Sequence, residues 1–141
     1  MKKHNIENFT GVFSKDMLPS VMAKSSSCII NIENYFEGNG THWVCVYNDS
    51  KSKDVENFDS FGLSPPDLIR HFLETTDKGI VYNNVDIQHI NSMMCGYYCC
   101  YYVIKRYARV KPLDILLEFD QGPSTDNERA IREIAHRLLS P

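Results

Sequence analysis

Apolar residues follow two different periods along this chain, and each period predicts a type of element. Short stretches rich in β-branched and aromatic residues are typical of strands. They lie at 28–32, 42–47, 55–61 and 80–87. The third of these strands is expected to run antiparallel to the second, because only a short polar turn connects them.

Helical spacing of apolar residues predicts the remaining elements. Ser14 is expected to cap a short helix at 14–18, which Pro19 would end. Ser64 is expected to cap a second helix with Pro65 in its first turn. The apolar face of that helix would consist of Leu68, Ile69, Phe72 and Leu73. Further helices are predicted at about 95–110, at about 113–119 and from 125 onward.

These elements predict an α+β fold, with a mixed β-sheet of four or five strands packed against helices. One buried helix would begin at Cys95. The length of 141 residues is near the commonest domain size, so we expect a single domain over 1–141. No apolar run approaches the roughly 20 residues that cross a bilayer, and residues 1–8 lack the apolar stretch of a signal peptide. We therefore expect no membrane association.

Charge and cysteine content narrow the function further. The net charge of −3 disfavours a general nucleic-acid binder. A basic cluster in the long helix is better explained as a solvated face, and consists of Lys105, Arg106, Arg109 and Lys111. Five cysteines, three of them within six residues, indicate free thiols in an intracellular reducing compartment. There is no Cys-x2-Cys pair and no glycine-rich nucleotide motif, so we expect no metal and no cofactor.

Cys95 is the strongest candidate for chemistry. At the start of a helix its thiol would meet unpaired N–H groups and the positive end of the helix dipole, which favour thiolate. Gly96 would let the backbone approach a substrate carbonyl, whose oxyanion nearby N–H groups could hold. The alternative is a small buried apolar residue, an interpretation that fits the other four cysteines well.

Three further residues could complete a cysteine hydrolase. His42 opens a predicted strand, at an edge where its ring could reach both solvent and the thiol, and its ordinary pKa suits proton transfer near neutral pH. Asp59 lies between two aromatic residues and would be costly to bury unless it accepted a hydrogen bond from His42. Gln88 could donate to the oxyanion. Each of the three also has a non-catalytic interpretation: His42 could be a surface histidine, Asp59 an exposed aspartate at a strand end, and Gln88 a polar loop residue.

The order of these motifs resembles the adenovirus maturation protease family (adenain) and, more distantly, the ubiquitin-like-protein proteases (deSUMOylases). The motifs are His42-Trp43, Phe58-Asp59-Ser60-Phe61-Gly62, Gln88 with Ser92, Cys95-Gly96 and Cys99-Cys100. The resemblance implies a papain-like fold with Cys95 as nucleophile and His42 as general base and acid. It also implies that Asp59 orients His42 and that Gln88 donates to the oxyanion.

Spacing bears on the branch of the family. Gln88 precedes Cys95 by seven positions, as in adenain, whereas the deSUMOylases place the glutamine one residue closer. Against this, Asp59 followed by a serine resembles the deSUMOylases. The resemblance favours a viral maturation endopeptidase that cleaves precursor structural proteins at glycine-containing sites, with Trp43 and Gly96 lining the substrate groove. The alternatives are a protease that removes a ubiquitin-like modifier and a non-catalytic binding module.

The chain also departs from adenain, which is activated by a disulfide-linked peptide and by DNA. No cysteine lies between Cys45 and Cys95, so that disulfide is not expected, although a peptide activator bound without one is compatible with the sequence. The acidic charge and the short segment after the last predicted helix indicate that DNA is not required. The resemblance implies a location in the virion and the infected host cell.

Overall fold

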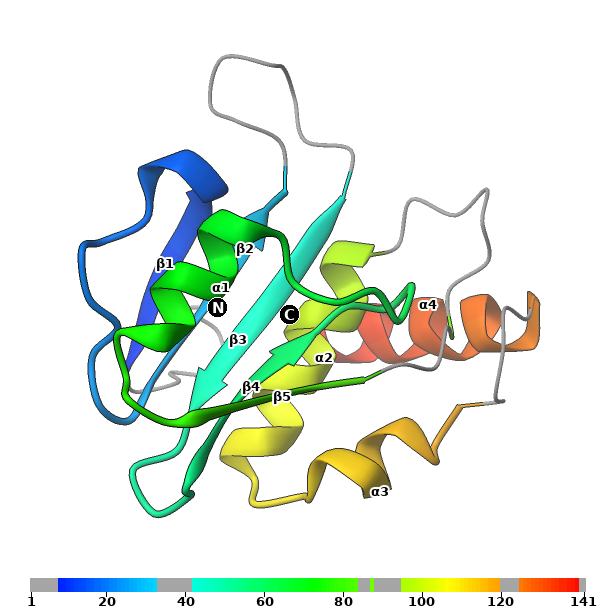
Figure 1. Cartoon of the computed structure of the whole chain (residues 1–141). Helices are drawn as coiled ribbons and strands as arrows, with labels where there is room; N and C mark the ends of the chain where they lie inside the picture. The colour runs from blue at the N-terminus through cyan, green and yellow to red at the C-terminus, as the bar shows by residue number, and fades with distance from the viewer. Residues whose placement is uncertain (1–7, 33–41, 84–86, 88–94, 120–124, 140–141) are drawn as a thin grey trace.

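The computed structural model describes residues 8–32, 42–83, 87, 95–119 and 125–139. Its centre is a five-stranded sheet in the order β1-β2-β3-β4-β5. The two outer pairs are parallel and the two inner pairs are antiparallel, which confirms the predicted mixed sheet and α+β class (Figure 1). The strands are β1 (Phe9–Ser14), β2 (Ser26–Asn31), β3 (Trp43–Asn48), β4 (Asp54–Phe58) and β5 (Gly79–Tyr82).

Helices cover both faces of this sheet. The helix α1 (Asp67–Glu74) lies on one face, while α2 (Cys95–Tyr107) lies across the other (Figure 1). The helices α3 (Pro112–Leu116) and α4 (Thr125–Leu139) flank α2 on its side of the sheet. A single 3-10 turn, η2 (Lys15–Met17), follows β1. The sheet is therefore the middle layer, with α2 held against its second face.

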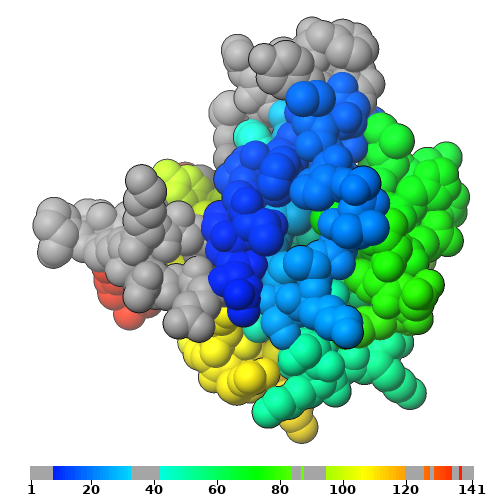
Figure 2. Space-filling view, turned by 90° about the vertical axis from the view of Figure 1, so that its left-hand side faces the viewer, coloured from blue at the N-terminus to red at the C-terminus, as the bar shows by residue number. Residues whose placement is uncertain are grey.

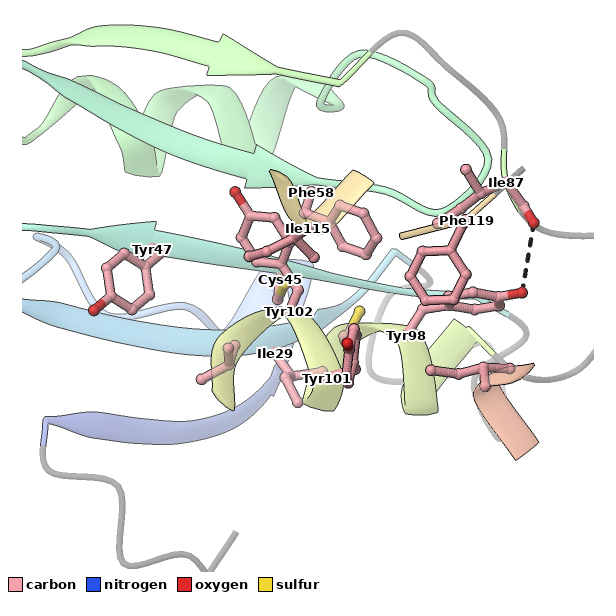
Figure 3. Packing of buried hydrophobic residues seen from close by; sticks show 13 residues of the cluster. Ile29, Cys45, Tyr47, Phe58, Ile87, Tyr98, Tyr101, Tyr102, Ile115 and Phe119 are labelled. Atoms are coloured by element: carbon pink, nitrogen blue, oxygen red, sulfur yellow. Dashed lines mark hydrogen bonds between the residues drawn. The ribbon is translucent and has the colours of Figure 1, made fainter. Parts of the chain in front are cut away.

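Side chains of the central strands alternate between two apolar clusters, as the pleat requires. In β3, Val44 and Val46 face the α1 cluster, whereas Cys45 and Tyr47 face the cluster around α2. Aromatic rings dominate the second cluster (Figure 3). The clearest pair is Phe58 and Tyr102, whose rings stack with centroids 4.5 Å apart. This packing fixes the distance between α2 and the inner strands.

The strand β1 was missed by the sequence pattern. Its side chains are only half-buried or exposed, so no continuous apolar stretch marks it. It pairs in parallel with β2 and lies between the α1 side and the α2 side of the molecule, as Figure 2 shows. Gly11 adopts a φ of 129° within it, a conformation that favours glycine, and the register shifts between Phe9 and Val12.

The predicted start of α1 was wrong, whereas the predicted start at Ser14 was right in position but not in the type of helix. Pro66 occupies the N-cap of α1 and no side chain caps the helix, so Ser64 is not the cap and Pro65 lies outside the first turn. Leu68 is 45% exposed, which leaves Ile69, Phe72 and Leu73 as the buried face of α1. Ser14 does hold the N-cap position of η2, but without a side-chain hydrogen bond, and the turn is 3-10 rather than α-helical.

Two predicted strands end earlier than expected. β4 stops at Phe58, because a turn follows in which the N–H of Gly62 donates to the carbonyl of Asp59 at 2.8 Å. Gly62 has a φ of 73° there, which a residue with a side chain rarely adopts. β5 stops at Tyr82, and residues 84–86 of the predicted strand lie outside the described residues. Asp59 thus leaves the sheet for a turn.

Arg106 is not part of a solvated basic face, contrary to the prediction. Its side chain is buried, and its guanidinium donates to both carboxylate oxygens of Glu56, at 2.8 and 2.7 Å. The guanidinium also lies 4.8 Å from the ring centroid of Tyr47. Because Glu56 belongs to β4, this bidentate pair joins the C-terminal half of α2 to the sheet.

Candidate active site

The start of α2 lies beside the start of β3. The N–H of Trp43 donates to the Cys95 Sγ at 3.4 Å, and the Cys99 thiol donates to the Trp43 carbonyl at the same distance. Cys95 and Cys99 are one helical turn apart, so they bind the two polar groups of a single residue. This arrangement holds the residue before Trp43, His42, next to the Cys95 thiol.

His42 and Asp59 meet because they flank neighbouring antiparallel strands. His42 immediately precedes β3 and Asp59 immediately follows β4, which places both at the same end of the sheet. The His42 Nε2 and the Asp59 Oδ1 lie 2.7 Å apart, and both side chains are buried. A buried carboxylate at this distance from an imidazole has the partner that compensates for its burial.

Phe61 holds the geometry of this pair from two sides. Its backbone N–H donates to the Asp59 Oδ1 at 2.8 Å. Its ring stacks on the His42 imidazole, with centroids 4.5 Å apart and planes inclined by 23°. The carboxylate and the imidazole therefore have little freedom to rotate.

The electrostatic environment of His42 favours the imidazolium ion. Burial by itself would lower the pKa of His42, but the hydrogen bond with Asp59 and the negative charges of Asp59 and Cys95 outweigh burial and raise that pKa to about 9. Asp59 occupies Nε2, and the buried Nδ1 has no aligned hydrogen bond to another described residue. Nδ1 is therefore the nitrogen left to face the Cys95 thiol.

Cys95 is shifted in the complementary direction. Burial opposes its ionisation, yet the pKa of the thiol falls below its usual value because His42 and the N–H groups of Trp43 and Gly96 stabilise the thiolate. Burial raises the pKa of Cys28 to about 12 and also raises the pKa of Cys99. The site therefore favours ionisation of Cys95 over that of Cys28 and Cys99, and it favours protonation of His42 beside Cys95.

The structure brings together His42, Asp59 and Cys95, three of the four residues that the sequence placed in the site. Gln88 lies outside the described residues, so its position stays a prediction. His42 does not sit at an exposed edge, as the sequence analysis expected, but is only 5% exposed. His42 therefore meets the Cys95 thiol in the interior of the protein rather than at an exposed edge.

Trp43 and Gly96 also lie at the site, as predicted. A methyl group built on Gly96 would come within 4.0 Å of the Trp43 Cδ1, so the indole lies over the first turn of α2. Trp43 is half-buried. The two residues are thus placed to shape the approach to the Cys95 thiol.

Sequence reasoning missed Asn83. Its side-chain Nδ2 donates to the Asp59 carbonyl, and its Oδ1 accepts a hydrogen bond from the Asp59 N–H at 3.0 Å. An asparagine after a strand is also an ordinary loop residue, so nothing in the sequence distinguishes it. Phe61 could have been found, because it belongs to the motif that carries Asp59.

Neither a metal centre nor a membrane segment is found in the described part of the chain. No group of three or more His, Cys, Asp or Glu side chains there could hold a metal ion. Among the helices described, none has both the length and the apolar character to cross a membrane.

Similarity to known proteins is confined to three-dimensional structure. No protein-family model matches the chain, and no curated protein matches it. One crystal structure of the ASFV pS273R protease superposes with a TM-score of 0.57 and 21% identity over 76% of this chain. A second structure of that protease gives a TM-score of 0.51 and 22% identity over 64% of this chain.

The SUMO protease Ulp1, with its catalytic cysteine oxidised to a sulfinic acid, covers 81% of this chain at 25% identity, but its TM-score of 0.47 is too low to define a shared fold. This chain spans less than half of the ASFV protease, 42% in the first structure and 36% in the second. The two superpositions on the ASFV pS273R protease show that the chain shares its α+β fold.

Proposed function

We propose that this chain is a cysteine peptidase in which Cys95 is the nucleophile and His42 is the general base and acid. One observation carries the proposal: His42 lies between Asp59 and Cys95, and the pKa values of the imidazole and the thiol are shifted toward an ion pair. The fold shared with a protease supports it. Such an ion pair is the activated state that thiol-dependent acyl transfer requires.

The reaction follows from this geometry. The Cys95 thiolate would attack the peptide carbonyl carbon, forming a C–S bond while the carbonyl oxygen becomes an oxyanion. The His42 imidazolium would give its proton to the amide nitrogen, and the C–N bond would break. Water, giving a proton to His42, would then attack the acyl-enzyme and release the acid and the thiolate. Backbone N–H groups at the start of α2 and the amide of Gln88 are the proposed oxyanion donors.

We further propose that the substrates are viral precursor proteins cut at glycine-containing sites. The indole of Trp43 lies beside Gly96 at the start of α2, and we propose that it narrows the substrate groove there, which would favour residues without a large side chain. A ubiquitin-like modifier ending in Gly-Gly would satisfy the same restriction, and the aspartate at 59, followed by Ser60, favours this second candidate. We propose that neither DNA nor a disulfide-linked activator is required, because the chain is acidic and has no cysteine between Cys45 and Cys95.

Substitution of the nucleophile tests the activity itself. Cys95→Ala should abolish cleavage of quenched peptides that contain glycine-rich sites, whereas Cys100→Ala should not, because Cys100 is outside the ion pair. Losing a nucleophile or its base costs orders of magnitude in rate. If Cys95→Ala cleaved as well as the unchanged protein, the proposed function would be wrong.

The proposed specificity is tested by varying the size of the substrate residue before the cut. Replacing the glycine before the cut with leucine should abolish turnover, and Trp43→Ala should partly restore cleavage of the leucine peptide. A ubiquitin-like modifier carrying a C-terminal vinyl sulfone separates the two substrate classes. Its covalent reaction with Cys95, together with no cleavage of precursor peptides, would favour the modifier protease.

A further inference from the structure

We propose that Asn83 is a positioning residue for this site: its side-chain amide holds the backbone of Asp59, and through Asp59 it sets the His42 ring for proton transfer to and from Cys95. The inference rests on the proposed function, since it concerns the same three residues. Both hydrogen bonds that the structure gives between Asn83 and the site go to the backbone of Asp59, so the proposed action runs through Asp59.

The Asn83 side chain exchanges two hydrogen bonds with the Asp59 backbone, as paired residues of neighbouring strands do with their backbones. The Asn83 Oδ1 accepts from the Asp59 N–H at 3.0 Å, and the Asn83 Nδ2 donates to the Asp59 carbonyl. A planar amide with one donor and one acceptor matches these two backbone groups. Aspartate or leucine at position 83 could not make both bonds, so the residue type matters.

The location explains why a side chain is needed here. β4 and β5 are parallel, and their last registered pair joins Asn57 to Tyr82. The chain then leaves the sheet at Asp59, where the backbone ladder of these two strands has ended. Asn83, the first residue after β5, continues the pairing with its side chain. The Asn83 side chain thereby fixes the Asp59 backbone just beyond the last pair of the β4–β5 ladder.

Small movements of Asp59 would matter for the base. A single carboxylate oxygen, Oδ1, accepts from both the Phe61 N–H and the His42 ring, at 2.8 and 2.7 Å. Rotation of the Asp59 backbone would lengthen at least one of these bonds, and hydrogen bonds weaken steeply away from good geometry. Among the described residues, the titratable groups that shift the His42 pKa are Asp59 and the Cys95 thiol.

A thiol-alkylation profile tests this role without any substrate. The full chain, with Asn83→Ala and Asn57→Ala as variants, would be treated with iodoacetamide across pH 5 to 10, and the modification of Cys95 followed by mass spectrometry. Asn57 is a matched control: it is a buried asparagine on the adjacent strand whose amide has no hydrogen-bond partner among the described residues.

Loss of the Asn83 amide should weaken the ion pair and shift Cys95 ionisation upward by about one pH unit, which is about tenfold slower alkylation near pH 6. Asn57→Ala should keep the profile of the unchanged protein. Thermal unfolding of each variant separates a local effect from global destabilisation. Asn83→Leu, which keeps the branched shape of the side chain but neither hydrogen bond, serves in case the alanine variant does not fold.

A folded Asn83→Ala or Asn83→Leu protein with the unchanged alkylation profile would overturn the inference. A merely structural role would lower the unfolding temperature without moving that profile. The proposed function fails on a different result, peptide cleavage by Cys95→Ala. The two failures are therefore distinguishable, because alkylation reports the ion pair and cleavage reports the peptidase.

Discussion

Asp59→Asn isolates the charge of the acid from its shape. The asparagine has nearly the same size, and its carbonyl oxygen can still accept from the His42 ring and from the Phe61 N–H. The backbone bonds between position 59 and Asn83 do not involve the carboxylate, so they should remain. The substitution therefore removes one negative charge, at 2.7 Å from an imidazole nitrogen, and little else.

The magnitude follows from the pKa of His42. A rise from 6.5 to about 9 corresponds to a preference for the imidazolium of about 3 kcal/mol, shared between Asp59 and Cys95. A charge-assisted hydrogen bond contributes about 1.5–3 kcal/mol. We therefore expect kcat/KM to fall by roughly ten- to a hundredfold at neutral pH.

The pKa shifts also predict the direction in which the pH limits of activity should move in Asp59→Asn. A raised pKa keeps His42 protonated up to about 9, so removing the charge should move the alkaline loss of the ion pair to lower pH. The acidic limb follows ionisation of Cys95, whose thiolate is stabilised by His42 and by the N–H groups of Trp43 and Gly96, so it should stay nearly where it is. The active range should therefore narrow from the alkaline end, by about one to two pH units.

The assay is the pH profile of Cys95 alkylation together with kcat/KM on a glycine-site peptide. Asp67→Asn is the control, because Asp67 is an exposed aspartate whose described ion pair is with the exposed Arg70. An alkaline limb that stays where it is in folded Asp59→Asn would refute the reasoning, since His42 would then owe its raised pKa to other groups.

Two further predictions concern thiol selectivity and stability. Iodoacetamide at neutral pH should label Cys95 and spare Cys28, whose pKa is raised to about 12, and peptide mapping of the labelled protein checks this. Glu56→Ala should lower the free energy of unfolding in urea by about 3–5 kcal/mol, because it leaves a buried guanidinium without its bidentate partner. Asp67→Ala, which breaks an exposed ion pair, should cost less than about 1 kcal/mol. Equal losses from the two would contradict the structural role of Glu56.

The elements that the sequence predicted well are those buried on both faces. β2 and β3 carry apolar residues at successive positions because a helix layer covers each side of the sheet. β1 and β5 were missed or misplaced because they are edge strands with exposed positions, where no apolar pattern is required. An apolar pattern in the sequence reports which positions are buried, and an edge strand is buried at only some of its positions.

The sequence indicated the three residues that the structure brings together in the candidate site, but not the residues that hold them in place. His42, Asp59 and Cys95 have residue types that define a chemistry, so a motif can identify them. Arg106 was misread because its partner Glu56 lies 50 positions away, and only the fold brings them together. Asn83 is missed for the same reason, since its function depends on the place where β4 and β5 stop pairing.

A single residue, Trp43, favours opposite ionisation states in two neighbouring thiols. Trp43 offers its N–H to Cys95 and its carbonyl to Cys99. A donor facing Cys95 favours thiolate there, and an acceptor facing Cys99 favours the protonated thiol, whose pKa burial also raises. The negative charge is thereby confined to the first turn of α2, where the helix dipole stabilises it and where His42 lies. The residue that holds the proposed base next to Cys95 also favours Cys95 over Cys99 as the proposed nucleophile.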